Sequence, residues 1–121
     1  MALHNELGIK GEALAEKYLR GKGFRIIERN WTHEKNEIDI IASNDEFIIF
    51  VEVKTRTSGY WGNPEEAVSE SKIRRIVEAS DFYLNINDVV MPARFDVIAI
   101  IMNDRFTRID HFEDAFLAPL N

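Results

Sequence analysis

The sequence predicts a mixed α/β domain, with a central mixed β-sheet flanked by helices in the order αβββαββ. Two observations lead to this prediction. Segments of helical periodicity stand on either side of a group of strand-like runs rich in branched residues. The second helical segment also separates two buried-strand patterns, which indicates a parallel crossover. At 121 residues the chain has the usual length of one domain, so we expect residues 1–121 to form a single domain.

The first half of the chain predicts a helix and three strands. Residues 5–22 have apolar side chains at helical spacing, and glycines at 21 and 23 offer a C-terminal stop. Residues 24–31 are typical of a strand, followed by a polar loop to Asn36. Residues 37–42 and 46–54 predict a hairpin, with a turn centred on Asn44 and Asp45.

The second half predicts a helix and two strands. Apolar spacing favours a helix through Leu84, with Asn63 as its N-cap and Pro64 in its first turn. Residues 94–101 read as a buried strand and residues 105–112 as an amphipathic edge strand, before a terminal turn or tail. Arg94 and Asp96 share a face of the buried strand and predict a structural ion pair.

The predicted hairpin brings acidic side chains together. A turn centred on Asn44 and Asp45 places Glu37 opposite Glu52 and Asp39 opposite Phe50. Asp39 and Glu52 are then diagonal neighbours, within roughly 7 Å of one another. Glu12 interrupts a helix stripe that should pack against the core, so it becomes a further candidate.

Clustered carboxylates that are shielded from water must bind either a proton or a cation. Mg²⁺ (or Mn²⁺) takes oxygen ligands, and two carboxylates with a backbone carbonyl are a typical protein contribution. Lys54 points to the same side as Glu52 and would stabilise charge developing on a phosphate. The alternative is that Glu52 and Lys54 form an ordinary exposed ion pair, worth well under about 1 kcal/mol.

The composition restricts the classes of function. Cysteine is absent, which excludes disulfides, zinc–thiolate sites and thiol nucleophiles. The net charge of −6 argues mildly against a broad nucleic-acid-binding surface. No secretory signal or membrane-spanning apolar run is visible, so we expect a soluble, cytoplasmic protein without a membrane partner.

Basic and aromatic residues outside the acidic cluster have two interpretations each. A phosphate-binding track or a solvated surface would explain the basic residues, and stacking on exposed bases or covering a helix end would explain the aromatic ones. The candidates for nucleic-acid binding are Arg56, Lys72, Arg75, Tyr60 and Trp61.

Six sequence blocks, in order and at matching spacing, resemble the YraN family, also called UPF0102. The blocks are "LGIKGEALAEKYL", "IIERNW", "EIDIIA", "FVEVKTR", "WGNPEEAV" and "RFDVIAI". The resemblance covers the chain from Leu7 to Phe116 and extends to the restriction-endonuclease-like superfamily with PD-(D/E)xK nuclease cores. It therefore implies a restriction-endonuclease-like fold.

The resemblance also implies roles for individual residues. Asp39 and Glu52 match the metal ligands, and Lys54 matches the catalytic lysine. Glu12 matches a further acid on the first helix of archaeal Holliday-junction resolvases, which are similar proteins. Glu37 matches the acid of the family's Gly-Glu-Ile-Asp block, in which Asn36 here replaces the glycine.

From this resemblance we expect a Mg²⁺-dependent endonuclease that binds and cleaves DNA, with branched or distorted duplex favoured. A first alternative is a non-catalytic domain that binds nucleic acid or protein on a nuclease fold. A second is a metal-dependent phosphohydrolase acting on nucleotides, although no nucleotide-binding loop is evident. Analogy with resolvases, which cut a four-way junction symmetrically, adds the expectation of a homodimer.

Overall fold

The computed structural model describes residues 6–58 and 68–116. Within these residues the elements are α1 (Glu6–Gly21), β1 (Arg25–His33), β2 (Asn36–Ser43), β3 (Ile48–Arg56), α2 (Glu70–Ile86), β4 (Ala93–Met102) and β5 (Thr107–Phe112). The predicted mixed α/β fold in the order αβββαββ is confirmed. Neither helix in this described part of the chain is long and apolar enough to span a membrane.

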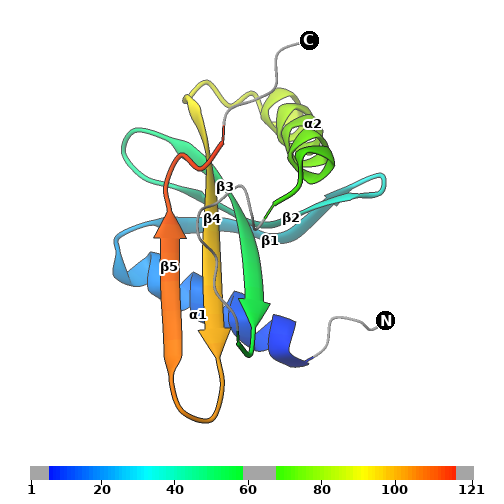
Figure 1. Cartoon of the computed structure of the whole chain (residues 1–121). Coiled ribbons are helices and arrows are strands. Elements are labelled where there is room, and N and C mark those ends of the chain that lie inside the picture. The colour runs from blue at the N-terminus through cyan, green and yellow to red at the C-terminus, as the bar shows by residue number, and fades with distance from the viewer. Residues whose placement is uncertain (1–5, 59–67, 117–121) are drawn as a thin grey trace.

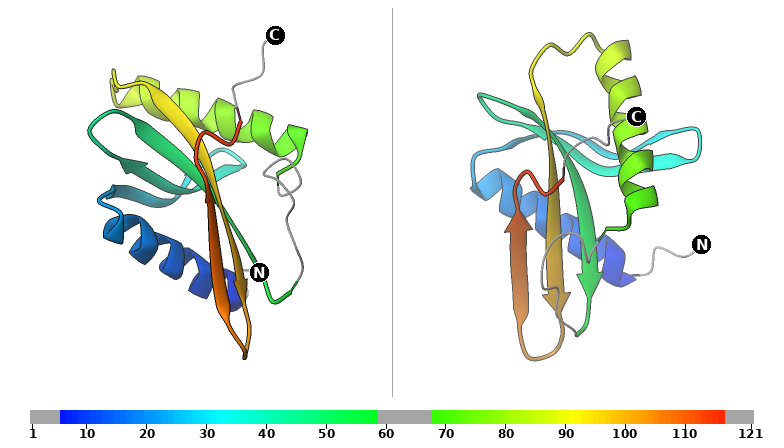
Figure 2. Two further views of the ribbon diagram at one scale, coloured as in Figure 1. Left: turned by 60° about the vertical axis from the view of Figure 1, so that its left-hand side comes forward. Right: turned by 45° about the horizontal axis from the view of Figure 1, so that its top comes forward.

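The strands form one mixed sheet in the order β1-β2-β3-β4-β5. All neighbouring pairs are antiparallel except β3 and β4, which are parallel and are connected through α2. In Figure 1, β1 and β2 run across the view while β4 and β5 run vertically, so the sheet is strongly twisted. Figure 2 shows α1 and α2 on opposite sides of this sheet, and each covers its own half of the core.

Helix α1 packs on the sheet through a narrow stripe of small and apolar residues. Gly11, Ala15 and Leu19, one turn apart, are its buried residues. A Cβ atom at Gly11 would overlap the hydroxyl of Thr55 and would lie 2.8 Å from the Cβ of Thr55. Glycine therefore allows the helix to approach the end of β3 more closely than any other residue would.

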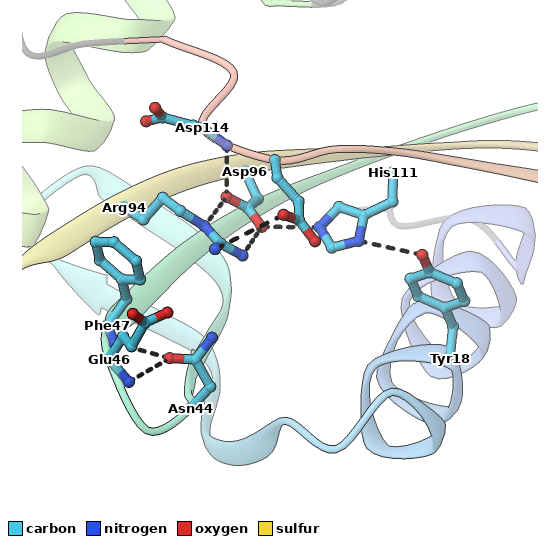
Figure 3. Close-up of polar contacts among 9 residues, drawn as sticks. Tyr18, Asn44, Glu46, Phe47, Arg94, Asp96, His111 and Asp114 are labelled. Atoms are coloured by element: carbon cyan, nitrogen blue, oxygen red, sulfur yellow. Dashed lines mark hydrogen bonds and ion pairs between the residues drawn. The ribbon is translucent and has the colours of Figure 1, made fainter.

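The turn between β2 and β3 differs from the prediction. Asn44 Oδ1 accepts hydrogen bonds from the backbone N–H groups of Glu46 (2.8 Å) and Phe47 (2.7 Å), as Figure 3 shows. The backbone N–H of Asn44 also donates to the carbonyl of Phe47. These bonds close a turn over residues 44–47, so the turn is not centred on Asn44 and Asp45.

The longer turn shifts the hairpin register by two residues. Ile41 pairs with Phe50, and the predicted pairing of Asp39 with Phe50 is therefore wrong, as is that of Glu37 with Glu52. A shift of two residues leaves every side chain on its predicted face. The error therefore changed the predicted neighbours without moving any acid to the other side of the sheet.

Helix α2 begins later than the sequence indicated. It starts at Glu70, after the N-cap residue Ser69, whose Oγ accepts a hydrogen bond from the backbone N–H of Lys72 (3.2 Å). Ser69 has extended backbone angles, so a continuous helix from Pro64 is ruled out at this position. Asn63 and Pro64 themselves lie outside the described residues.

A buried polar network joins β4, β5 and α1 (Figure 3). Arg94 donates from Nε and Nη2 to the two carboxylate oxygens of fully buried Asp96, both at 2.9 Å. His111 Nε2 lies 2.7 Å from Asp96 Oδ2, and its Nδ1 lies 3.2 Å from the hydroxyl of Tyr18. The ion pair expected from the sequence is present, but it belongs to a larger network in which His111 links three elements.

Candidate functional site

The candidate site lies where β2 and β3 stop pairing. Their paired residues extend from Ser43 and Ile48 to Ile40 and Val51. At the next position Asp39 Oδ2 accepts a hydrogen bond of 2.8 Å from the backbone N–H of Val53, so a side chain replaces the strand-to-strand bond. Asp39 and Glu52 are the first residues beyond the last pair, Ile40 and Val51, and the charge of Glu52 acts on Asp39. The two predicted metal ligands thus lie close together where the pairing ends.

Both carboxylates of this pair are buried, with Asp39 9% and Glu52 4% exposed. Burial raises the pKa of Asp39 well above its usual range, and the charge of Glu52 raises it further. The N–H group of Val53 opposes this rise, as does Lys72, whereas Glu12 adds to it. Burial and the neighbouring acid therefore make the charged form of Asp39 costly in the absence of a bound cation.

Two lysine ammonium groups face Glu52. The Nζ of Lys72 lies 3.4 Å from Glu52 Oε2, and the Nζ of Lys54 lies 3.8 Å from the same oxygen. The sequence predicts Lys54 beside Glu52, whereas for Lys72 it offers a phosphate-binding track or a solvated surface. The structure instead brings Lys72 from α2 to Glu52. The other oxygen, Glu52 Oε1, is buried and has no hydrogen-bond partner.

Glu12 and Glu37 lie on the α1 side of the site. A cleft of about 310 Å³ between α1, β1 and β2 is lined in part by Glu12, Asn30 and Asp39. With its amide nitrogen turned toward the acids, Asn30 donates to Glu12 Oε1 (3.0 Å) and to Glu37 Oε2 (3.2 Å). Glu37 therefore adjoins Glu12 instead of facing Glu52.

Sequence reasoning missed Asn30. Its backbone has a positive φ of 49°, a conformation that asparagine tolerates better than most residues. Position 30 falls within a predicted strand, so periodicity alone offered no signal for a positive φ or for an amide aimed at two acids.

The other predicted residues are exposed or lie outside the described residues. Arg56 is exposed at the end of β3, and Arg75 is exposed on α2, with its Nη1 3.5 Å from Ser71 Oγ. Tyr60 and Trp61 lie outside the described residues. The structure therefore brings Asp39, Glu52, Lys54, Lys72 and Glu12 together, and it leaves Arg56 and Arg75 at the surface.

The donor set fits one divalent cation of the Mg²⁺ type. In residues 6–58 and 68–116, no three Asp, Glu or His side chains form a ready-made metal cluster. Asp39 and Glu52 offer two carboxylates, and Glu52 Oε1 is buried with no hydrogen-bond partner. Because Mg²⁺ keeps several water ligands, two carboxylates suffice for a protein contribution.

Fold and site together define a class of protein: mixed α/β domains of αβββαββ order with a buried acid pair where two central strands separate. The profile of the family described as "Uncharacterised protein family UPF0102" matches residues 11–100. The chain belongs to this family.

Bacterial relatives match over nearly their whole length. A UPF0102 protein of Flavobacterium psychrophilum is 46% identical over 116 residues, which covers 96% of this chain and 98% of the relative. A UPF0102 protein of Christiangramia forsetii has the same identity and coverage. One of Phocaeicola vulgatus is 45% identical over 120 residues and covers 99% of both chains. The resemblance inferred from the sequence blocks is thus confirmed at the level of the family.

Proposed function

We propose that this protein is a metal-dependent phosphodiesterase that binds and cleaves DNA as an endonuclease. The observation that carries the proposal is the buried pair of Asp39 and Glu52, with Lys54 and Lys72 at the same carboxylate. A buried acid pair beside two ammonium groups at the end of a sheet matches the site that the nuclease resemblance implies. The preference for branched or distorted duplex rests on that resemblance alone.

In the proposed reaction each residue has a separate role. Mg²⁺ or Mn²⁺ at Asp39 and Glu52 would supply Lewis-acid chemistry toward the phosphodiester. Lys54, whose side chain is 37% exposed, would reach a phosphate oxygen from solvent and stabilise the charge developing there. Glu12, held by Asn30 in the cleft beside Asp39, would orient the attacking water. Hydrolysis forms a P–O bond to that water, which releases one proton to solvent, and breaks the P–O bond to the leaving oxygen, which takes one proton from solvent.

DNA would approach along the exposed side of the lysines. Arg56, two residues beyond Lys54, and Arg75, three residues beyond Lys72, are both exposed. Such residues bind phosphates through charge, which makes the affinity dependent on salt. An overall negative charge then limits binding to this small surface instead of excluding it.

The experiment that tests the proposal measures cleavage of linear, branched and single-stranded DNA with Mg²⁺ or Mn²⁺. The variants Asp39→Asn and Glu52→Gln keep side-chain size while removing a charge, and Lys54→Met removes the ammonium group. We expect each variant to lose at least about a hundredfold in rate, as loss of a group that stabilises the transition state generally does. Asp81→Asn, an exposed carboxylate on α2, is the matched control and should leave the rate unchanged.

Cleavage that persists in all three site variants would refute the assignment. Metal-independent DNA binding without cleavage of any substrate would instead support the non-catalytic alternative. The branched substrate decides specificity: equal rates on linear and branched DNA would remove the structural preference while keeping the activity.

A further inference from the structure

We propose that Lys72 occupies the cation position of the acid pair in the metal-free protein, and that a divalent cation must displace its ammonium group from Glu52. The inference rests on the proposed function, because it concerns the same pair of acids. It assigns Lys72 a positioning role that the sequence did not indicate, since the sequence offered only a phosphate-binding track or a solvated surface for this residue.

Contacts at the site distinguish Lys72 from Lys54. The Nζ of Lys72 is the nearer of the two to Glu52 Oε2, at 3.4 Å against 3.8 Å. Lys72 also interacts electrostatically with Asp39, whose charged form it favours. Its charge therefore acts on both carboxylates, as a bound cation would.

The position of Lys72 on α2 allows its ammonium group to move away from Glu52. Lys54 is on β3, two residues from Glu52, so both side chains project from the same strand. Lys72 reaches Glu52 from the first turn of α2, where Ser69 caps its backbone N–H and buried Ile76 anchors the helix. The ammonium group can thus leave Glu52 by rotating its four side-chain bonds, without disturbing either the helix or the strand.

Exchange of the two cations has a thermodynamic consequence. Lys72 supplies one positive charge to the acids and a divalent cation supplies two, so the exchange relieves more of the repulsion within the pair. The metal must first break the contact of Lys72 with Glu52, however, and this lowers its apparent affinity. Once released, the ammonium group stands beside the site, within reach of a substrate phosphate.

Calorimetric titration of the full chain with Mn²⁺ tests this inference without measuring activity. Lys72→Met removes the competing charge and should bind Mn²⁺ about tenfold more tightly than the wild type, the order expected for one partly solvated charge near the ion. Lys72→Arg keeps the charge and should bind within about twofold of the wild type, on the same argument. Arg74→Met, which removes an exposed charge from the same helix, is the control for general electrostatics and should also change the affinity by less than about twofold.

Thermal unfolding supplies a second measurement. Without metal, Lys72→Met should melt below the wild type, because Glu52 loses its nearer ammonium group. At saturating Mn²⁺ this difference should disappear. Affinity for Mn²⁺ that is unchanged or weakened in Lys72→Met would overturn the inference while leaving the proposed function intact. Absence of Mn²⁺ binding in the wild type and in Lys72→Met would refute the metal centre of the proposed function, and this inference with it.

Discussion

The close approach of α1 to β3 predicts that Gly11→Ala destabilises the protein. Alanine normally stabilises a helix relative to glycine by about 1 kcal/mol. At this position the added methyl would overlap Thr55, and its distance of 2.8 Å to the Thr55 Cβ cannot be relieved by rotating the threonine side chain. Overpacking of this kind costs about 1–3 kcal/mol. The overpacking cost less the helix gain leaves a net loss of up to about 2 kcal/mol, and at about 4 °C per kcal/mol the melting temperature should fall by up to about 8 °C.

Chemical denaturation and thermal melting would measure this loss. Gly21→Ala is the matched control on the same helix, because a Cβ at Gly21 meets no atom within 4 Å. Combining Gly11→Ala with Thr55→Gly should show a favourable coupling of about 1–2 kcal/mol in a double-mutant cycle. If Gly11→Ala were as stable as Gly21→Ala, the helix would not lie as close to β3 as described.

Two further predictions concern carboxylates with lowered pKa values. Burial raises the pKa of Asp96, but hydrogen bonds from His111 and Arg94 outweigh it and hold the value below its usual range. The stability that Asp96 contributes is therefore present above pH about 4 and is lost as the pH falls through the lowered value. Asp96→Asn should lower the free energy of unfolding by about 3–5 kcal/mol, because it leaves Arg94 with no buried charge partner. It should also flatten the fall of the urea midpoint at acid pH, and a fall as steep as that of the wild type would contradict this role of Asp96. Hydrogen bonds from Arg29, the largest influence, and from Arg20 together with their charges lower the pKa of Glu16 to about 2. Arg29→Met should return the Glu16 midpoint in a carboxyl NMR titration toward 4.5, and a midpoint still near 2 would refute the role of Arg29.

Local periodicity was sufficient to predict the elements and their faces. Residues two apart on a strand share a face whatever the register, so Glu52 and Lys54 could be placed together from the sequence. Asp39 joined them because a two-residue error in register does not change the face. The acid pair was therefore predictable even though its pairing was not.

Features that depend on a single side chain or on long-range contact could not be predicted. Asn44 decides the turn by binding two backbone N–H groups, and adjacent turn residues offered an equally reasonable centre. The contact of Lys72 with Glu52 spans the connection from β3 to α2, and the contact of His111 with Asp96 requires β5 to pair beside β4. No periodic pattern records contacts of this kind.

The hydrogen bond from the backbone N–H of Val53 to Asp39 links hydrogen exchange in the sheet to the state of the candidate site. The amide proton of Val53 is protected by a carboxylate instead of a backbone carbonyl, so its exchange with solvent depends on the charge and position of one side chain. Chemistry at Asp39 is thereby coupled to the local opening of β3, the strand that also carries Glu52 and Lys54. Asp39→Ala removes both the charge and the acceptor of the Val53 N–H group, so it changes the acid site and weakens the strand at once. Asp39→Asn removes the charge but keeps an acceptor oxygen, so it separates the effect on the site from the effect on the strand.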